Sequence, residues 1–147
     1  MTMNETIVRF GYPDTLVAEY HHWVVLLRPE QPTLGSLILA AVGEARALAA
    51  LSAEAFIELR TVVGEIETML RSAVGYEKIN YLMLMMVDPH VHWHVIPRYE
   101  GRREAAGVMV SDAGWPKIPQ LSETVKLNAA QIAALREWLR SNRTTAG

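Results

Sequence analysis

The chain has 147 residues, half of them apolar, and its 14 lysines and arginines nearly balance its 16 aspartates and glutamates to a formal net charge of −2. With so little net charge and no basic stripe, we expect a small-molecule ligand and no nucleic acid polymer. Cysteine is absent, which excludes disulfide bonds and thiolate metal sites.

The length predicts one domain spanning residues 1–147. Its longest apolar run, residues 81–87, is too short to cross a bilayer, and the N-terminus carries Glu5 and Arg9 in place of an apolar signal region. We therefore expect no membrane association and a cytoplasmic location.

The first third of the chain predicts antiparallel strands. Short stretches rich in β-branched and aromatic residues alternate there with turn-forming Pro29, Pro32 and Gly35. The three strands are expected at residues 15–20, 23–27 and 37–41.

A long helix is predicted from Ser52, a good N-cap, to about residue 74. Its apolar side chains recur every three or four residues, the spacing of one helical stripe: Phe56, Leu59, Val63, Ile66 and Leu70. Gly75 stands where helices commonly end in the left-handed conformation.

Two more strands are predicted after the helix, at residues 79–87 and 91–97, divided by Asp88-Pro89. Residues 78–87 are apolar at nearly every position, so we expect a helix or a second subunit to cover both faces of that strand.

The C-terminal part predicts an irregular arm over residues 101–122, rich in glycine and proline, and a second helix at about residues 129–141 after the capping pair Asn128 and Gln131. The order of elements predicts an α+β fold. Its core, residues 15–100, is an antiparallel sheet of about five strands with the long helix packed on it.

Three histidines alternate along the last predicted strand. Because successive strand side chains point to opposite faces, His90, His92 and His94 share one face, and Val91, Trp93 and Val95 share the other. Imidazole titrates near neutrality, so one ring can be a neutral nucleophile while a neighbour donates a proton or stabilises negative charge. This division of labour suits attack on a phosphorus centre.

Two other interpretations compete. The histidines are structural if the strand face is simply packed, although three on one face are hard to explain by packing alone. They are metal ligands if a third ligand, His21 or His22, completes the site, but three successive same-face residues are too extended to wrap one ion.

The run from His90 to Arg98 resembles the defining motif of the histidine triad (HIT) family, in which three histidines alternate with apolar residues, followed here by Val95-Ile96-Pro97-Arg98. The loop with Pro32 and Gly35 is similar to the family's proline loop. The segment Asp112-Ala113-Gly114-Trp115-Pro116 looks like an arm found in a bacterial branch of the family.

The resemblance implies an HIT-like fold and a hydrolase or nucleotidyl transferase acting on a small-molecule nucleotide: a nucleoside phosphoramidate, a dinucleoside polyphosphate or a related compound. His92 would attack the α-phosphorus and form a transient nucleotidyl-histidine, with His94 and His90 orienting it. The resemblance also implies a homodimer. No metal or other cofactor is required for the covalent step, although a divalent metal is compatible with it.

The sequence departs from the family pattern at several places. Met85, Met86 and Val87 replace residues that touch phosphates in many members, and Arg28 stands near the usual ribose-binding position. Arg28, Asn80 and Arg98 are the candidate nucleotide-binding residues. A binding module with little catalysis, or a histidine-ligated metalloprotein, therefore remains as an alternative to an enzyme.

Overall fold

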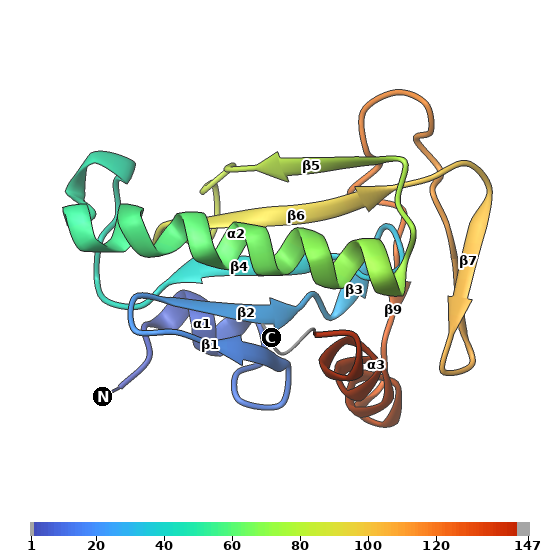
Figure 1. Ribbon diagram of the computed structural model, residues 1–147, viewed down its shortest axis with the longest axis horizontal. Coiled ribbons are helices and arrows are strands. Elements are labelled where there is room, and N and C mark those ends of the chain that lie inside the picture. The colour runs from blue at the N-terminus through green and yellow to red at the C-terminus, as the bar shows by residue number, and fades with distance from the viewer. Residues whose placement is uncertain (1, 144–147) are drawn as a thin grey trace.

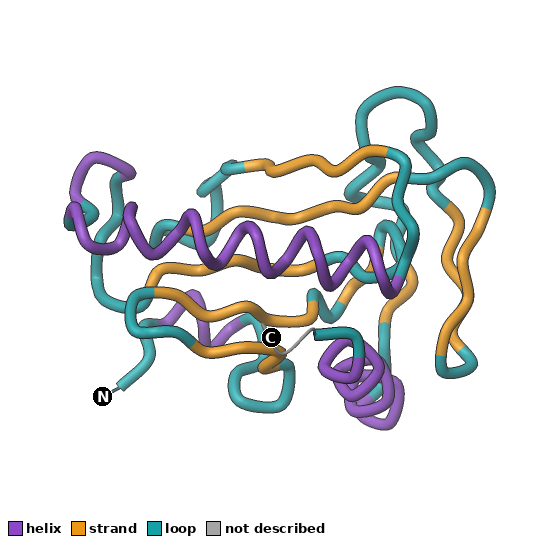
Figure 2. Tube along the Cα trace, viewed as in Figure 1, coloured by secondary structure: helices purple, strands orange, loops and turns teal. Residues whose placement is uncertain are grey.

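A computed structural model describes residues 2–143. Its centre is a five-stranded sheet in which all neighbouring strands are antiparallel (Figures 1 and 2). In spatial order the strands are β1 (Leu16–Glu19), β2 (Trp23–Leu27), β4 (Leu37–Ala41), β6 (His92–Arg98) and β5 (Lys78–Leu82).

The remaining elements surround this sheet. Within residues 2–143 there are three helices, α1 (Glu5–Arg9), α2 (Ala53–Ala73) and α3 (Ala129–Ser141), and a short 3-10 turn (Leu48–Ala50) before α2. Two small antiparallel pairs complete the fold: β3 (Glu30–Gln31) with β9 (Val125–Lys126), and β7 (Arg102–Ala105) with β8 (Val108–Ser111).

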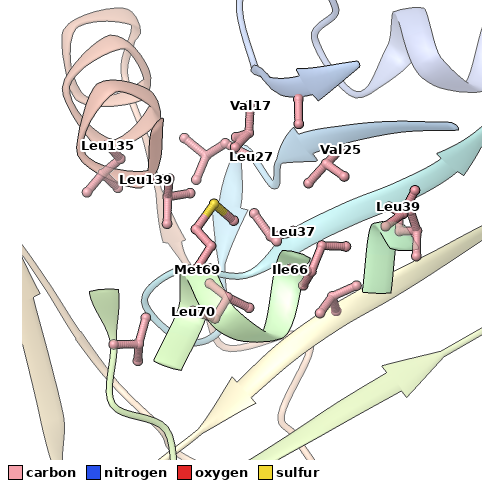
Figure 3. Packing of buried hydrophobic residues seen from close by; sticks show 14 of the residues in the cluster. Val17, Val25, Leu27, Leu37, Leu39, Ile66, Met69, Leu70, Leu135 and Leu139 are labelled. Atoms are coloured by element: carbon pink, nitrogen blue, oxygen red, sulfur yellow. The ribbon is translucent and has the colours of Figure 1, made fainter. Parts of the chain in front are cut away.

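Helix α2 lies across one face of the sheet and forms the main core with it (Figures 1 and 3). Its N-terminus is capped by Ser52, whose hydroxyl accepts a hydrogen bond from the Ala55 amide. Its buried residues, among them Ile66, Met69 and Leu70, pack against the side chains of Val25 and Leu37. The helix α3 side chains Leu135 and Leu139 extend the same core (Figure 3).

Helix α1 covers the opposite face of the sheet. Ile7 is fully buried in a second cluster with Val24, Leu26, Ile38 and Ala40. The Asn4 side chain caps the helix and also donates to the carbonyl oxygens of residues 41 and 43. The sheet is thus packed on both faces, by α2 on one and by α1 on the other.

The predicted fold class is confirmed: α+β, with five antiparallel strands, a long helix on the sheet and a C-terminal helix. Ser52 and Gly75 delimit the long helix as predicted, Gly75 having a positive φ of 62°. Asn128 and Gln131 form the predicted capping box.

The predicted strand over residues 79–87 is wrong beyond Leu82. The strand ends before Met85, which has a φ of +49° that a strand does not tolerate. The segment then runs over the surface, with Met86 88% and Val87 82% exposed. Strand β5 itself lies at the sheet edge and is only half-buried, so no element within residues 2–143 covers both of its faces.

Four further features differ from the sequence predictions. The arm is not wholly irregular, because it begins with the hairpin of β7 and β8, which turns through Ala106 and Gly107, both with positive φ. Helix α1 and the β3–β9 pair were not predicted. Phe56 was placed on the buried stripe of α2 but is 41% exposed, whereas Val62 and Met69 are buried instead.

Among the helices of residues 2–143, none combines the length and the apolar character needed to cross a membrane.

Two isoleucines of α2 offer a matched test of this packing. Ile66 is 2% exposed under the sheet, while Ile57 is 74% exposed on the same helix. We expect Ile66→Ala to lower the free energy of unfolding by about 3 kcal/mol, through lost burial and the cavity left behind. Ile57→Ala should change it by less than about 0.5 kcal/mol. Urea denaturation followed by circular dichroism measures both, and equal losses would contradict the assigned face.

Candidate active site

Strand β6 delivers His92 and His94 to the α1 face of the sheet. His92 lies opposite Ala40 and His94 opposite Ile38, both of which belong to the cluster under α1. The two imidazole rings lie with their centroids 5.3 Å apart. On the other face, Val91, Trp93 and Val95 join the core under α2. The predicted alternation is therefore confirmed for this strand.

A backbone carbonyl fixes the protonation of His92. Its ring Nδ1 lies 2.7 Å from the carbonyl oxygen of His90. Because a carbonyl oxygen only accepts, Nδ1 carries the proton, and in the neutral ring the lone pair belongs to Nε2. No hydrogen bond within residues 2–143 involves Nε2. Because no fully buried side-chain nitrogen or oxygen in that range lacks a partner, Nε2 keeps some access to solvent. The neutral ring can therefore act as a nucleophile only through Nε2.

His90 is held between helix α1 and the loop after β4. Its Nδ1 lies 2.8 Å from the Thr6 hydroxyl, and its Nε2 lies 2.8 Å from a carboxylate oxygen of Glu44. The His90 amide also donates to the Thr6 hydroxyl. With both ring nitrogens occupied, His90 anchors the start of the strand and presents its carbonyl to His92.

His94 is paired with Arg28, which follows β2. The Arg28 Nε donates to Nδ1 of His94 across 3.2 Å. Burial, and to a lesser extent the charges of Arg28 and His92, lower the pKa of His94 to about 4, against a small opposing effect of Asp88. His94 is therefore neutral near pH 7, with its remaining proton on Nε2.

Phe10, at the end of α1, packs beside both rings. Its ring centroid lies 5.5 Å from that of His92 and 6.0 Å from that of His94. His92 is only 2% exposed and His94 8%. The Phe10 side chain therefore places apolar surface along one side of these two rings.

Asn80 and Arg98 meet each other, apart from the three histidines. Arg98 makes a buried two-pronged ion pair with Asp112, and it also donates to the Asn80 side chain and to the carbonyl of Lys117. These contacts tie the arm to the sheet. Beside them lies a cavity of about 650 Å³, lined by strand β5 and by the arm around Trp115. The nucleotide-binding roles of Asn80 and Arg98 stay predictions.

No family model and no curated protein matches the sequence, but solved structures do. A histidine triad protein from Bradyrhizobium japonicum is 17% identical, with a TM-score of 0.73 over 97% of this chain and 98% of that one. One from Sinorhizobium meliloti is 20% identical, with a TM-score of 0.73 and 96% of each chain covered. A hypothetical histidine triad nucleotide-binding protein from Sulfolobus tokodaii is 18% identical, with a TM-score of 0.67 over 93% of this chain and 88% of that one.

The chain has the histidine triad fold. This likeness confirms, at the level of the fold, the resemblance that residues 90–98 indicate. The three histidines His90, His92 and His94 are accordingly called the triad.

His21 and His22 are not gathered with the triad. Their rings pack on each other, 4.5 Å apart, in the turn between β1 and β2, and their amides donate to Glu58. Within the described residues, no group of three histidine, aspartate or glutamate side chains is arranged to hold a metal ion. The geometry of residues 2–143 therefore does not supply the third ligand that a zinc site on the triad requires.

Three residues that contact the triad were not predicted from the sequence: Thr6, Phe10 and Glu44. For α1 a signal exists, since Asn4 is a good N-cap, Glu5 stands in the first turn and Arg9 in the last. For Glu44 the sequence offers no signal, because the contact joins residues 46 positions apart.

The protonation of His94 gives a test by pH. Because its pKa is depressed in the folded protein, the unfolded chain binds more protons between about pH 6.5 and about pH 4, and stability falls as the pH falls through that window. We expect the free energy of unfolding of the wild type to fall more steeply there than that of His94→Asn. Urea titrations across this pH window measure the free energy of unfolding of both proteins. Equal slopes for wild type and His94→Asn would show that His94 titrates normally.

Proposed function

We propose that this chain binds a nucleotide and cleaves a bond at its α-phosphorus, through a covalent nucleotidyl-histidine on His92. The observation that carries the proposal is the hydrogen bond from His92 Nδ1 to the His90 carbonyl, which leaves Nε2 as the basic nitrogen. The fold supports it, as does the name of the Sulfolobus tokodaii protein, which includes nucleotide binding.

The proposed reaction has two balanced steps. First, the Nε2 lone pair forms a bond to phosphorus as the bond to the leaving group breaks, and the leaving group keeps that electron pair. The His92 ring becomes a cation, and its Nδ1–H bond to the His90 carbonyl stabilises the charge. Second, water attacks the phosphorus, Nε2 takes back its electron pair, and the nucleoside monophosphate is released with loss of one proton.

Other site residues would stabilise the charge on the phosphoryl oxygens. His94 would donate a hydrogen bond from Nε2, and Arg28 beside it supplies a positive charge. Both steps are served by the chain's own groups, so we propose that no metal is needed for the covalent chemistry. Asn80 and Arg98 would take part only if nucleotide binding frees them from the arm.

A binding module with little catalysis is the second candidate. The stretch from Met85 to Val87 favours it, because these residues have no polar side chain to bind a phosphate. Met86 and Val87 are also exposed to solvent. Nucleotide titration without turnover of either a phosphoramidate or a dinucleoside polyphosphate would select this candidate over the enzyme.

We also propose that the chain forms a homodimer joined at strand β5. We propose a cytoplasmic location for it. Strand β5 is an edge strand with half-buried side chains, and Leu84, Met86 and Val87 leave apolar surface beside it. Sedimentation velocity should give twice the monomer mass of 16.5 kDa at micromolar concentration, and a monomer there would contradict the proposal.

Substitution of the nucleophile tests the enzyme directly. His92→Asn keeps a side-chain donor near the His90 carbonyl but removes the nucleophilic nitrogen. We expect kcat to fall by a factor of about 10⁴ or more, with nucleotide affinity and unfolding free energy nearly unchanged.

Rapid acid-free quenching followed by peptide mass spectrometry should locate the nucleotidyl group on His92 in the wild type. The exposed His21→Asn variant is the control and should keep full turnover. An adduct on any other residue, or substantial turnover by His92→Asn, would refute the assignment.

A further inference from the structure

The pairing of Arg28 with His94 is built into the loop between β2 and β4. The Arg28 amide donates to the Ser36 carbonyl at 3.0 Å, and the Arg28 carbonyl accepts from the Gln31 side chain at 2.6 Å. Gln31 and Ser36 are themselves fully buried. The backbone of Arg28 is thus fixed where its side chain reaches over the sheet to His94.

This contact limits what His94 can do. Its Nδ1 accepts the Arg28 Nε–H, so a second proton on the ring would have to displace that bond and face a guanidinium. The groups around the ring are Arg28, His92, the Phe10 ring and Asp88, and Asp88 is already engaged by Arg9 at 3.3 Å. His94 therefore donates a hydrogen bond from Nε2 but does not supply a whole proton near pH 7.

The two kinds of leaving group differ in their need for that proton. When a phosphorus–oxygen bond of an anhydride breaks, the departing phosphate oxygen keeps the electron pair and is a stable anion at neutral pH. When a phosphorus–nitrogen bond breaks, the departing amine must receive a proton as the bond breaks. A site whose His94 is not a cation therefore favours release of a phosphate over release of an amine.

Resting on the function proposed above, we infer that Arg28 is a specificity-determining positioning residue that selects nucleotide anhydrides, with a phosphate or polyphosphate leaving group, over nucleoside phosphoramidates. The guanidinium occupies Nδ1 of His94 and adds to the effect of burial in disfavouring a second proton on the ring. In the proposed reaction it also supplies a positive charge to the anionic leaving group. The amine-releasing reaction lacks its acid, while the phosphate-releasing reaction gains a counter-charge.

The test uses two substrates with one nucleotidyl group: adenosine 5′-phosphoramidate and diadenosine triphosphate. The wild type should have a kcat/KM roughly 100-fold higher for the triphosphate, the lower range of what a general acid contributes. In Arg28→Gln this preference should shrink by about tenfold or more, with the phosphoramidate rate improving at lower pH as His94 takes a proton. Arg28→Lys, which restores the charge, should recover most of the preference.

The outcomes separate the two proposals. Turnover of neither substrate overturns both. Turnover with no preference for the anhydride overturns only the selection by Arg28. The same holds if KM rises by the same factor for both substrates in Arg28→Gln, because Arg28 would then only bind a phosphate common to both. An NMR titration of the His94 ring tests the inference without any turnover. The ring should take up its second proton at higher pH in Arg28→Gln than in the wild type, and no change between the two proteins overturns the inference.

Discussion

The hydrogen bond from the His92 ring to the carbonyl two residues earlier is the interaction on which this site depends. It joins residues only two positions apart at the start of β6, yet it determines which nitrogen of His92 carries the lone pair. The carbonyl must be held in place for this to work. The His90 ring does so, with one nitrogen at Thr6 of α1 and the other at Glu44. His90 therefore supports His92 by fixing the backbone carbonyl to which the His92 ring donates.

Packing on both faces makes strand β6 rigid enough for this role. Val91 and Val95 are fully buried under α2, and the histidine face lies against the cluster that Ile7 of α1 completes. Helix α1 has only five residues and is too short to be stable alone. Its contacts with the sheet, through Asn4 and Thr6, give it its structure, and in return it encloses the site.

The sequence was informative where structure is local and poor where it is not. Strand alternation placed the triad on one face, and the caps at Ser52 and Asn128 marked both main helices, because those signals lie within a few residues. The prediction made strand β5 too long because the apolar residues continue past Leu82, whereas the backbone turns at Met85. The pairing of Arg28 with His94 joins residues 66 positions apart, so no local sequence pattern predicts it. The β7–β8 hairpin was missed because its turn at Ala106-Gly107 lacks the usual asparagine or aspartate.

The tautomer of His92 is the most direct test of the proposed chemistry. Nitrogen-15 NMR of the histidine rings should show the neutral His92 ring with its proton on Nδ1 and with the nitrogen signal of an unprotonated Nε2. A spectrum in which the neutral ring carries its proton on Nε2 would mean that His92 has no lone pair on that nitrogen to offer to phosphorus.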